Sequence, residues 1–361
     1  MASKQINTLT LSERIQVLSD LGDYLRQETE LGKKSSAAFT NLIAQVEREN
    51  PWFTSEFTQK AIQAWAKLLD NDRLTTFVAP YQIAQDSSSK KPKTVLLILA
   101  GNIPLVGMHD LVCCFLSGEK SLIKLASKDK LVVPFLTSWI IQHCPKARNY
   151  IEYVEGIASE FTHVIATGSD NSARYFEHYF SKYPSIIRKN RSSIGVITPN
   201  TTPAELQLVG EDIFTYFGLG CRNVTQLFIP HNFNFELLKE AFLGFNYLYN
   251  HNKYANNYDY QKAIYLMNQE QFYDLGHLLL IEKDKIKSPL GVLYYTCYHK
   301  IDEVEQFVTH NHNQIQCVVS DSSCPISHMS FGTAQYPDLW DFADQIDTLH
   351  FLLTSTYDEE A

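Results

Sequence analysis

Residues 218–223 read Gly-Leu-Gly-Cys-Arg-Asn and place a cysteine directly after a glycine-containing turn. Glycine allows the backbone to approach a substrate closely. Backbone N–H groups and the guanidinium of Arg222 can stabilise a thiolate at Cys221. The segment therefore makes Cys221 a candidate nucleophile. A lone cysteine is also a common small residue of protein cores, so a structural thiol is the alternative interpretation.

A second candidate is Asn102, in the segment Gly-Asn-Ile-Pro of residues 101–104, between an apolar run and a helical pattern. The side-chain amide of an asparagine can donate a hydrogen bond to an oxyanion, and so can a backbone N–H beside a nucleophile. The pattern is consistent with an oxyanion donor at Asn102. Asparagine is also a good N-cap residue, so a helix cap explains the same segment.

Thr167, Gly168 and Ser169 follow an apolar run and precede a helical pattern. A strand, a glycine turn and a helix N-terminus together form a common anion site, because the helix N-terminus presents unpaired N–H groups. A simple turn with a helix cap is the alternative. The sequence contains no Gly-x-Gly-x-x-Gly motif, so these residues alone do not establish dinucleotide binding.

Two pairs of adjacent reactive residues have ordinary explanations. Cys113 and Cys114 lie within an apolar helical stretch, and neighbours in a helix are poorly placed to face one ligand, so core packing is expected. Glu211 and Asp212 precede Cys221 by roughly two to three helical turns and offer a candidate base. A solvated helix face is the expected arrangement for both carboxylates.

Histidines and tyrosines add weaker signals. His310 and His312 alternate, but no carboxylate or third ligand nearby completes a metal site, so we expect exposed histidines and no metal. Five tyrosines crowd one region and are compatible with an acyl channel or with ordinary packing: Tyr247, Tyr249, Tyr254, Tyr258 and Tyr260.

The composition indicates a globular protein. The chain has 361 residues, 45% of them hydrophobic, which is ample for a large core in one or two domains. The net charge of -9 argues against a broad nucleic-acid surface. The longest apolar runs, such as residues 94–100, are too short to span a bilayer, and the polar N-terminus lacks a signal-peptide core. Seven cysteines without a Cys-x-x-Cys pair are expected as thiols, so we expect a cytoplasmic protein.

The N-terminal quarter of the chain has helical patterning. Thr10 or Ser12 can cap a first helix with apolar residues at helical spacing up to residue 25. Further helices are predicted over residues 35–49 and 55–69, and a polar connection over residues 84–93.

From residue 94 onwards, short apolar runs alternate with helical patterns. Because strands that alternate with helices of about a dozen residues form parallel βαβ units, the pattern predicts a doubly wound sheet, with ligands at the carboxyl ends of its strands. Strands are predicted over residues 95–99, 121–125, 150–154, 163–166 and 193–198, and helices over 105–116, where Pro104 suits the first turn, 132–143 and 171–183.

The alternation restarts after residues 200–203 and predicts a second α/β domain. A helix over residues 204–217 leads directly into the segment that carries Cys221. Further strands are predicted over residues 226–229, 277–282, 292–297 and 317–320, and further helices over 235–250, 260–268 and 302–310.

The order and spacing of these motifs resemble the aldehyde dehydrogenase superfamily, and more closely the LuxC-like acyl-CoA reductase family. The resemblance covers roughly residues 94–355. Residues 100–105 resemble the segment of the oxyanion asparagine, 123–127 the strand whose lysine meets the cofactor ribose, 167–169 the turn beside the pyrophosphate, and 214–221 the nucleophile loop. Residues 188–193 and 332–337 are similar to the reductase family in particular.

The resemblance implies an aldehyde dehydrogenase-like α/β fold with two doubly wound domains and a helical N-terminal region. The implied divisions are residues 1–90 for the helical region, 91–199 for the cofactor domain, 200–330 for the catalytic domain, and 331–361 for a segment that returns to the cofactor domain.

The implied function is NADPH-dependent reduction of an acyl thioester, with fatty acyl-CoA expected, to an aldehyde, and NADH is the alternative cofactor. Cys221 would form an acyl-enzyme and Asn102 would stabilise the oxyanion. Lys124 would hold the cofactor ribose, and Thr167, Gly168 and Ser169 its pyrophosphate.

The direction of the reaction follows from one difference. Aldehyde oxidisers carry a glutamate that activates water, whereas the similar stretch here, residues 188–191, reads Arg-Lys-Asn-Arg. Without a placed base, water attacks an acyl-cysteine slowly, which favours thioester reduction. The alternatives are an aldehyde-oxidising or CoA-acylating dehydrogenase, and a non-catalytic partner that retains the fold. The resemblance also implies an acyl-CoA or acyl-protein substrate, a homo-oligomer and an acyl-transferring partner.

Overall fold

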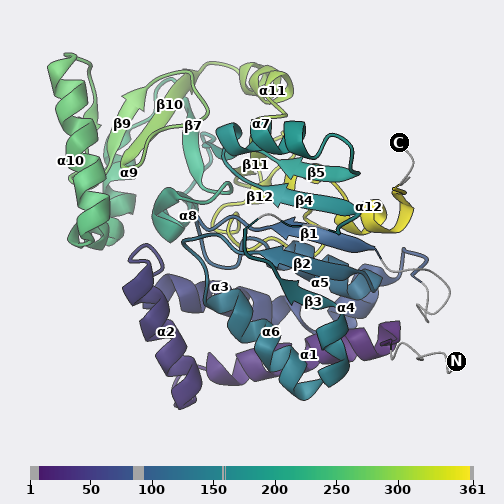
Figure 1. Cartoon of the computed structure of the whole chain (residues 1–361). Coiled ribbons are helices and arrows are strands. Elements are labelled where there is room, and N and C mark those ends of the chain that lie inside the picture. Colours follow the sequence, from purple (N-terminus) through teal and green to yellow (C-terminus); the bar gives the residue numbers. More distant parts are fainter. Residues whose placement is uncertain (1–7, 84–92, 157, 159, 358–361) are drawn as a thin grey trace, which may run out of the picture. The chain divides into compact units, whose positions relative to one another are not determined.

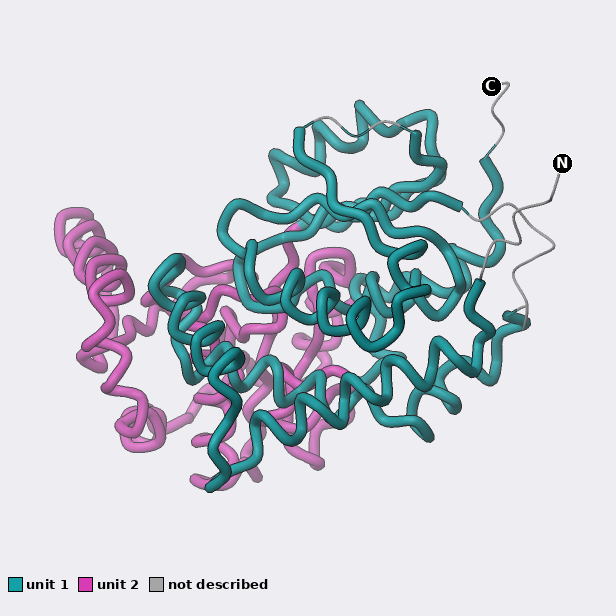
Figure 2. Tube along the Cα trace, turned by 60° about the horizontal axis from the view of Figure 1, so that its bottom comes forward, with its two compact units in different colours: residues 1–189, 338–361 teal, residues 190–337 magenta. Residues whose placement is uncertain are grey.

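The computed structural model describes residues 8–83, 93–156, 158 and 160–357. The chain divides into two compact units (Figure 2). Unit 1 comprises residues 1–189 and 338–361, and unit 2 comprises residues 190–337. The polar connection predicted at 84–93 lies outside the described residues, apart from Lys93.

Unit 1 begins with helices, as the sequence predicted. The first is held at its start by a capping box, in which the Thr10 hydroxyl and the Glu13 carboxylate each accept a backbone N–H of the other residue. The predicted three helices are present and a fourth, short one follows them, capped by Asp70. Their bounds are α1 (Leu11–Glu28), α2 (Ala37–Glu49), α3 (Ser55–Leu68) and α4 (Asn71–Val78).

A five-stranded parallel sheet, sheet A, forms the rest of unit 1 (Figure 1). Its strand order is β3-β2-β1-β4-β5, so the chain winds outward from β1 in both directions, and the predicted doubly wound topology is confirmed. The strands are β1 (Thr94–Ile98), β2 (Lys120–Lys124), β3 (Ile151–Tyr153), β4 (His163–Thr167) and β5 (Ser185–Arg188). The connections contain α5 (Met108–Ser117), α6 (Val132–His143), η2 (Pro145–Asn149) and α7 (Asp170–Tyr179).

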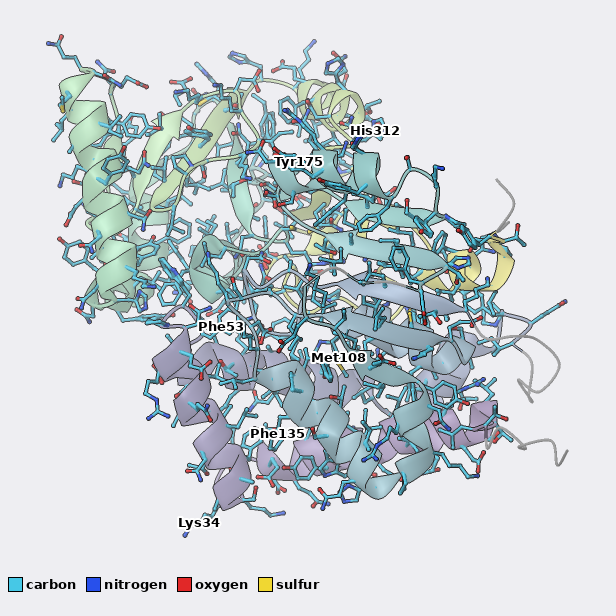
Figure 3. All side chains as sticks on the ribbon, viewed as in Figure 1. Lys34, Phe53, Met108, Phe135, Tyr175 and His312 are labelled. Atoms are coloured by element: carbon cyan, nitrogen blue, oxygen red, sulfur yellow. The ribbon has the colours of Figure 1, made fainter. Side chains whose placement is uncertain are left out.

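Both faces of sheet A are covered. Leu96, Leu122 and Val164 pack on one face against Phe176 of α7 and its neighbours. Because crossovers between parallel strands are almost always right-handed, we place α5 and α6 on the opposite face. Met108 at the start of α5, labelled in Figure 3, is fully buried. The apolar runs that the sequence shows are therefore strands buried on both sides.

The start of α5 differs from the prediction. Pro104 was expected in the first helical turn, but the helix begins at Met108 after Gly107. A Cβ at Gly107 would lie 2.2 Å from Cδ2 of Leu99, and Leu105 has a left-handed φ of 62°. The close approach of the chain to Leu99 therefore requires an irregular loop before the helix.

Unit 2 contains a second sheet, sheet B, with strand order β12-β11-β6-β7-β10-β9-β8. All pairs are parallel except β8 with β9, so the predicted second α/β domain is confirmed. The strands are β6 (Ser192–Val196), β7 (Val224–Pro230), β8 (Tyr273–Asp274), β9 (Leu279–Glu282), β10 (Val292–Tyr298), β11 (Ile315–Ser320) and β12 (Met329–Ser330). The helices are α8 (Pro203–Phe214), η3 (Thr215–Gly218), α9 (Phe235–Phe242), η4 (Leu243–Asn250), α10 (Asn252–Met267) and α11 (Ile301–His310).

Separate apolar clusters hold the helices of unit 2 to sheet B. Val304 and Phe307 of α11 pack with Ile194 and Phe228 from the central strands. Figure 1 shows α10 beside β9 and β10, where Tyr258 and other buried side chains form a second cluster. Of the five crowded tyrosines, Tyr254 and Tyr258 are buried, whereas Tyr247, Tyr249 and Tyr260 are exposed.

The division between the units lies at residues 189/190 and 337/338, compared with the expected 199/200 and 330/331. The first boundary is earlier because β6 pairs with β7 and β11 in the middle of sheet B. The later stretch η5 (Ala343–Gln345) and α12 (Thr348–Thr354) belongs to unit 1, where the Nζ of Lys93 donates to the carbonyls of Leu352 and Ser355 at the end of α12.

Within the described ranges, no helix has the length and apolar character needed to cross a membrane. The same ranges contain no group of three or more histidine, cysteine or acidic side chains arranged to hold a metal ion. His310 and His312 are exposed as expected, and Figure 3 labels His312 just beyond α11.

Candidate active site

The predicted site residues of unit 1 meet at the carboxyl edge of sheet A. Strand β1 lies between β2 and β4 and is parallel to both, with Ile98 opposite Lys124 on one side and Ala166 on the other. The segments that follow these three strands therefore emerge at the same edge. They carry Asn102, Lys124 and the turn from Thr167 to Ser169.

Asn102 lies in the irregular loop between β1 and α5, with a partly exposed side chain. The loop is tightly packed, because a Cβ at Gly101 would lie 2.7 Å from the Cβ of Ala126. Oδ2 of buried Asp129 accepts the N–H of Leu105 at 3.4 Å, and burial raises the pKa of Asp129 to about 6. Sequence reasoning missed Asp129, which anchors this loop.

Lys124 is the last residue of β2, and its Nζ donates to the carbonyl of Gly156 at 2.6 Å. Thr167 ends β4, and the hydroxyl of Ser169 accepts the N–H of Ser172 at 3.3 Å as the N-cap of α7. The helix cap that the sequence offered as an alternative is therefore present. The N-terminus of α7, with its positive end, points to the same edge as Lys124.

The segment of unit 2 that leads to Cys221, the predicted nucleophile, has an unusual backbone. The predicted helix over 204–217 ends at Phe214, because Tyr216 and Phe217 adopt left-handed φ angles of 55° and 56°. Gly218 follows with a φ of 77°. Of the three residues, only this glycine adopts a left-handed backbone without strain. Two bulky, buried residues in this conformation cost roughly 1–2 kcal/mol each. Strain of this kind persists only where surrounding contacts enforce it.

Asn223 enforces this backbone. Its Nδ2 donates to the carbonyls of Asp212 and Ile213, each at 3.1 Å, and to that of Thr215 at 2.8 Å. Its Oδ1 accepts the N–H of Gly220 at 2.8 Å. The side chain is fully buried, so water does not compete for these bonds. Asn223 thus joins the end of α8 to the residue that precedes Cys221.

Cys221 itself is partly exposed and precedes β7, at the amino edge of sheet B. The hydroxyl of Ser193 donates to the carbonyl of Cys221 at 3.2 Å and lies 3.0 Å from the Sγ of Cys317. The guanidinium of Arg222 contacts the Sδ of Met329 at 3.6 Å. The backbone of Cys221 is therefore held on both sides, by Asn223 through Gly220 and by Ser193.

Asp212 contradicts the expectation of a solvated helix face. Its side chain is fully buried in the last turn of α8, whereas Glu211 is partly exposed. The Oδ2 of Asp212 accepts the N–H of Gly332 at 2.7 Å, and its Oδ1 accepts that of Ala334 at 3.0 Å. Asp212 is therefore buried because it binds the backbone of a segment 120 residues away.

The other thiols and the Arg188 segment have structural surroundings. Cys113 and Cys114 are fully buried, as expected, and burial raises the pKa of both thiols well above the ordinary value. Arg188 ends β5 as a buried residue, paired with the carboxylate of Asp110 and donating to the hydroxyl of Thr348 at 3.0 Å. None of these three residues presents a reactive group to solvent.

No protein-family model matches the sequence, and no curated protein matches it. Solved structures do. An aldehyde dehydrogenase structure from Burkholderia cenocepacia is 12% identical, with a TM-score of 0.67 over 89% of this chain and 77% of that one. Aldehyde dehydrogenase 21 from Physcomitrella patens, in complex with succinate, is 13% identical, with a TM-score of 0.65 over 98% and 85%. An aldehyde dehydrogenase from Bacillus cereus in complex with NAD+ is 12% identical, with a TM-score of 0.61 over 88% and 73%.

This likeness is one of fold. The chain has the α/β architecture of the aldehyde dehydrogenases, with one parallel and one mixed sheet, and the predicted fold class is confirmed. The residues at the carboxyl edge of sheet A and the Cys221 segment at the amino edge of sheet B both lie within that architecture.

Proposed function

We propose that this chain is a nicotinamide-dependent oxidoreductase that reduces an acyl thioester to an aldehyde through an acyl-enzyme at Cys221. The observation that carries the proposal is the nucleophile segment. A partly exposed thiol follows three consecutive left-handed residues, in a chain with an aldehyde dehydrogenase fold. A backbone strained and fixed by a buried Asn223 is typical of a functional loop.

The covalent step uses groups of this chain. The thiolate of Cys221 attacks the carbonyl carbon of the thioester and forms a new C–S bond. The N–H of Cys221 and the side-chain amide of Asn102 are the proposed donors to the oxyanion. Collapse of the tetrahedral intermediate breaks the original C–S bond, and the carrier leaves as a thiol after it takes up a proton.

A nicotinamide nucleotide supplies the hydride when it is bound. The carboxyl edge of sheet A fits such a group, because Lys124 and the positive N-terminus of α7 suit an anionic nucleotide. We assign Lys124 to the ribose and Thr167, Gly168 and Ser169 to the pyrophosphate. NADPH is the proposed donor and NADH the alternative. Solved structures of this fold were determined with NAD+ or NADP, which supports the class of cofactor.

The proposed direction rests on residues 188–191, which contain no carboxylate. Arg188 is also buried and forms an ion pair with Asp110, so this position offers no base to activate water. An acyl-cysteine that water attacks slowly persists long enough to be reduced.

Aldehyde oxidation is the second candidate, because the solved structures of this fold are aldehyde dehydrogenases. Separate incubations with acyl-CoA plus NADPH and with aldehyde plus NAD+ distinguish the two directions. Reduction predicts NADPH oxidation with stoichiometric aldehyde. A protein that oxidises aldehyde to free acid and ignores acyl-CoA would contradict the proposal.

The substrate class is fatty acyl-CoA or an acyl-protein thioester, with a homo-oligomer and an acyl-transferring partner as further elements of the proposal. NADPH oxidation measured across acyl-CoA chain lengths defines the substrate. If neither NADPH nor NADH shifts the thermal unfolding temperature and no acyl adduct forms, the chain is a non-catalytic partner instead.

A further inference from the structure

We propose that Asp212 is a positioning residue for Cys221 and couples residues 332–334 to the nucleophile loop through Asn223. The inference rests on the proposed function, in which Cys221 is the nucleophile. It assigns a role to a buried carboxylate that no step of the proposed chemistry uses.

The carboxylate of Asp212 fixes a distant segment on the last turn of α8. Each oxygen accepts one backbone N–H, from Gly332 at 2.7 Å and from Ala334 at 3.0 Å. Hydrogen bonds to an ionised acceptor are about twice as strong as neutral ones. Gly332 has a left-handed φ of 80°, so this segment also adopts a conformation that its contacts must hold.

The backbone of the same residue is part of the nucleophile loop. The carbonyl of Asp212 accepts from Asn223, whose Oδ1 accepts the N–H of Gly220 beside Cys221. Asp212 and Asn223 are both fully buried. A continuous set of hydrogen bonds therefore runs from Gly332 to the residue before the thiol, and buried networks of this kind act as a unit.

Both connected segments need to be held. The loop contains Tyr216 and Phe217 in a left-handed backbone, which relaxes if its contacts loosen. The distant segment continues with Gln335, whose Nε2 is buried without a hydrogen-bond partner in the part of the chain that the structure describes. A buried, unsatisfied donor is costly, and an acceptor on a ligand would satisfy it. Asp212 therefore fixes the segment of this donor through its carboxylate, and contacts the thiol loop through its backbone carbonyl.

Asp212→Asn removes the charge and replaces one acceptor by a donor. Asp321→Asn is the matched control, since Asp321 is also a buried carboxylate of unit 2 and accepts from the hydroxyl of Thr198 at 2.8 Å. Asp321 follows β11 at the carboxyl edge of sheet B, whereas Cys221 precedes β7 at the amino edge. The control therefore reports the general cost of neutralising a buried carboxylate away from the loop.

The full-length protein is treated with iodoacetamide, and alkylation of Cys221 is followed by peptide mass spectrometry while thermal unfolding confirms folding. We expect about tenfold or more slower alkylation in Asp212→Asn, because iodoacetamide reacts with the thiolate, and a loosened loop holds fewer backbone N–H groups against that charge. Asp321→Asn should stay within about twofold of the parent, the spread expected for a site that does not couple to the loop. Equal rates in the parent and in Asp212→Asn would overturn the inference.

The set of hydrogen bonds from Gly332 through Asp212 and Asn223 to Gly220, here called the relay, also predicts that the effects of two substitutions on alkylation do not add. Asp212→Asn combined with Asn223→Ser should be no slower than the slower single variant, because both changes interrupt one set of bonds. If the fold-reductions in alkylation rate of the two single variants multiply in the double variant, the two residues act independently and the proposal is overturned.

Asn223→Ser covers the case in which Asp212→Asn does not fold. Because coupling is reciprocal, this variant should speed hydrogen exchange at the amides of Gly332 and Ala334 by about tenfold or more. Unchanged exchange would contradict the relay. Alkylation and exchange need neither thioester nor NADPH, so these results are separate from the turnover assay, which alone tests the proposed function.

Discussion

The guanidinium of Arg188 and the carboxylate of Asp110 form an ion pair with both side chains only 6% exposed. The pair joins the end of β5 to the first turn of α5 within unit 1, and Thr348 of α12 adds a hydrogen bond to the same guanidinium. Residue 188 is thus a structural element of unit 1. This structural role bears on the proposed direction of the reaction, which rests on residues 188–191 containing no carboxylate.

Arg188→Met should destabilise the protein by about 3–5 kcal/mol, because it leaves the charge of Asp110 buried without its partner. Chemical denaturation measures this difference. Lys189→Met is the control, since the ion pair of Lys189 with Glu177 is half exposed and is worth about 1 kcal/mol or less. A similar small effect of both substitutions would show that the buried pair does not contribute as described.

Cys221→Ala should abolish the covalent acyl adduct in intact mass spectra after incubation with acyl-CoA, and should abolish NADPH-dependent turnover. Cys144→Ala is the control, because Cys144 is a comparably accessible thiol in unit 1 at the end of α6. An acyl adduct that persists in Cys221→Ala would move the nucleophile to another residue.

Asn102→Ala should lower kcat by about 10²–10³-fold, or roughly 3–4 kcal/mol of barrier, with a much smaller change in KM. The reason is that an oxyanion donor binds the transition state and not the ground state. Steady-state kinetics with acyl-CoA and NADPH separate the two constants. A rise in KM at unchanged kcat would instead indicate a role in substrate binding.

Two buried groups of unit 1 should make stability depend on pH in opposite directions. Burial raises the pKa of Asp129 to about 6, so its contribution is favourable at pH 4 and is lost as the pH rises through 6. Burial, aided by the charge of Lys93, lowers the pKa of His163 to about 4, so its contribution is present above pH 6.5 and is lost towards pH 4. Between these limits the two effects largely cancel.

Asp129→Asn removes one of the two effects and should therefore reveal the other. Relative to that of the parent, we expect the free energy of unfolding of the variant to rise on the order of 3 kcal/mol from pH 4 to pH 7. Urea unfolding at several pH values measures the gain, with the exposed Asp20→Asn as control. Parallel curves for the parent and Asp129→Asn would contradict the assigned pKa of Asp129.

Local patterns predicted most of the elements. The apolar spacing and cap of α1 depend on residues within the helix or directly before it, and α6 occupies residues 132–143 as the sequence predicted. The parallel topology followed from the alternation of strands and helices. The eight-residue α4 was missed because so short a helix shows little periodicity.

The end of α8 depended on information outside the helix. Tyr216 and Phe217 are apolar and continue the helical pattern, so sequence reasoning extended the helix over them. The bonds from Asn223, eight to eleven residues away, hold the carbonyls that end it. A left-handed backbone at two non-glycine residues has no signal in residue type.

The two acidic neighbours at the end of α8 show a second reason for failure. Glu211 and Asp212 are similar in sequence, and only the amides of residues 332–334 distinguish them, by binding Asp212. Partners so distant along the chain leave no local pattern. Asn102, Lys124 and the turn from Thr167 to Ser169 were easier to place together, because they follow adjacent parallel strands.

The discontinuity of unit 1 has a consequence for biosynthesis. Residues 190–337 leave the ribosome before α12, whose end binds Lys93 and whose Thr348 binds Arg188. Unit 2 can therefore complete its hydrogen bonding during translation. Unit 1 needs residues 338–357 as well, because the bond from Arg188 to Thr348 forms only after α12 has been synthesised. Because domains fold as units as they emerge, we expect unit 2 to be completed before unit 1 along the nascent chain, although unit 1 is the first to begin.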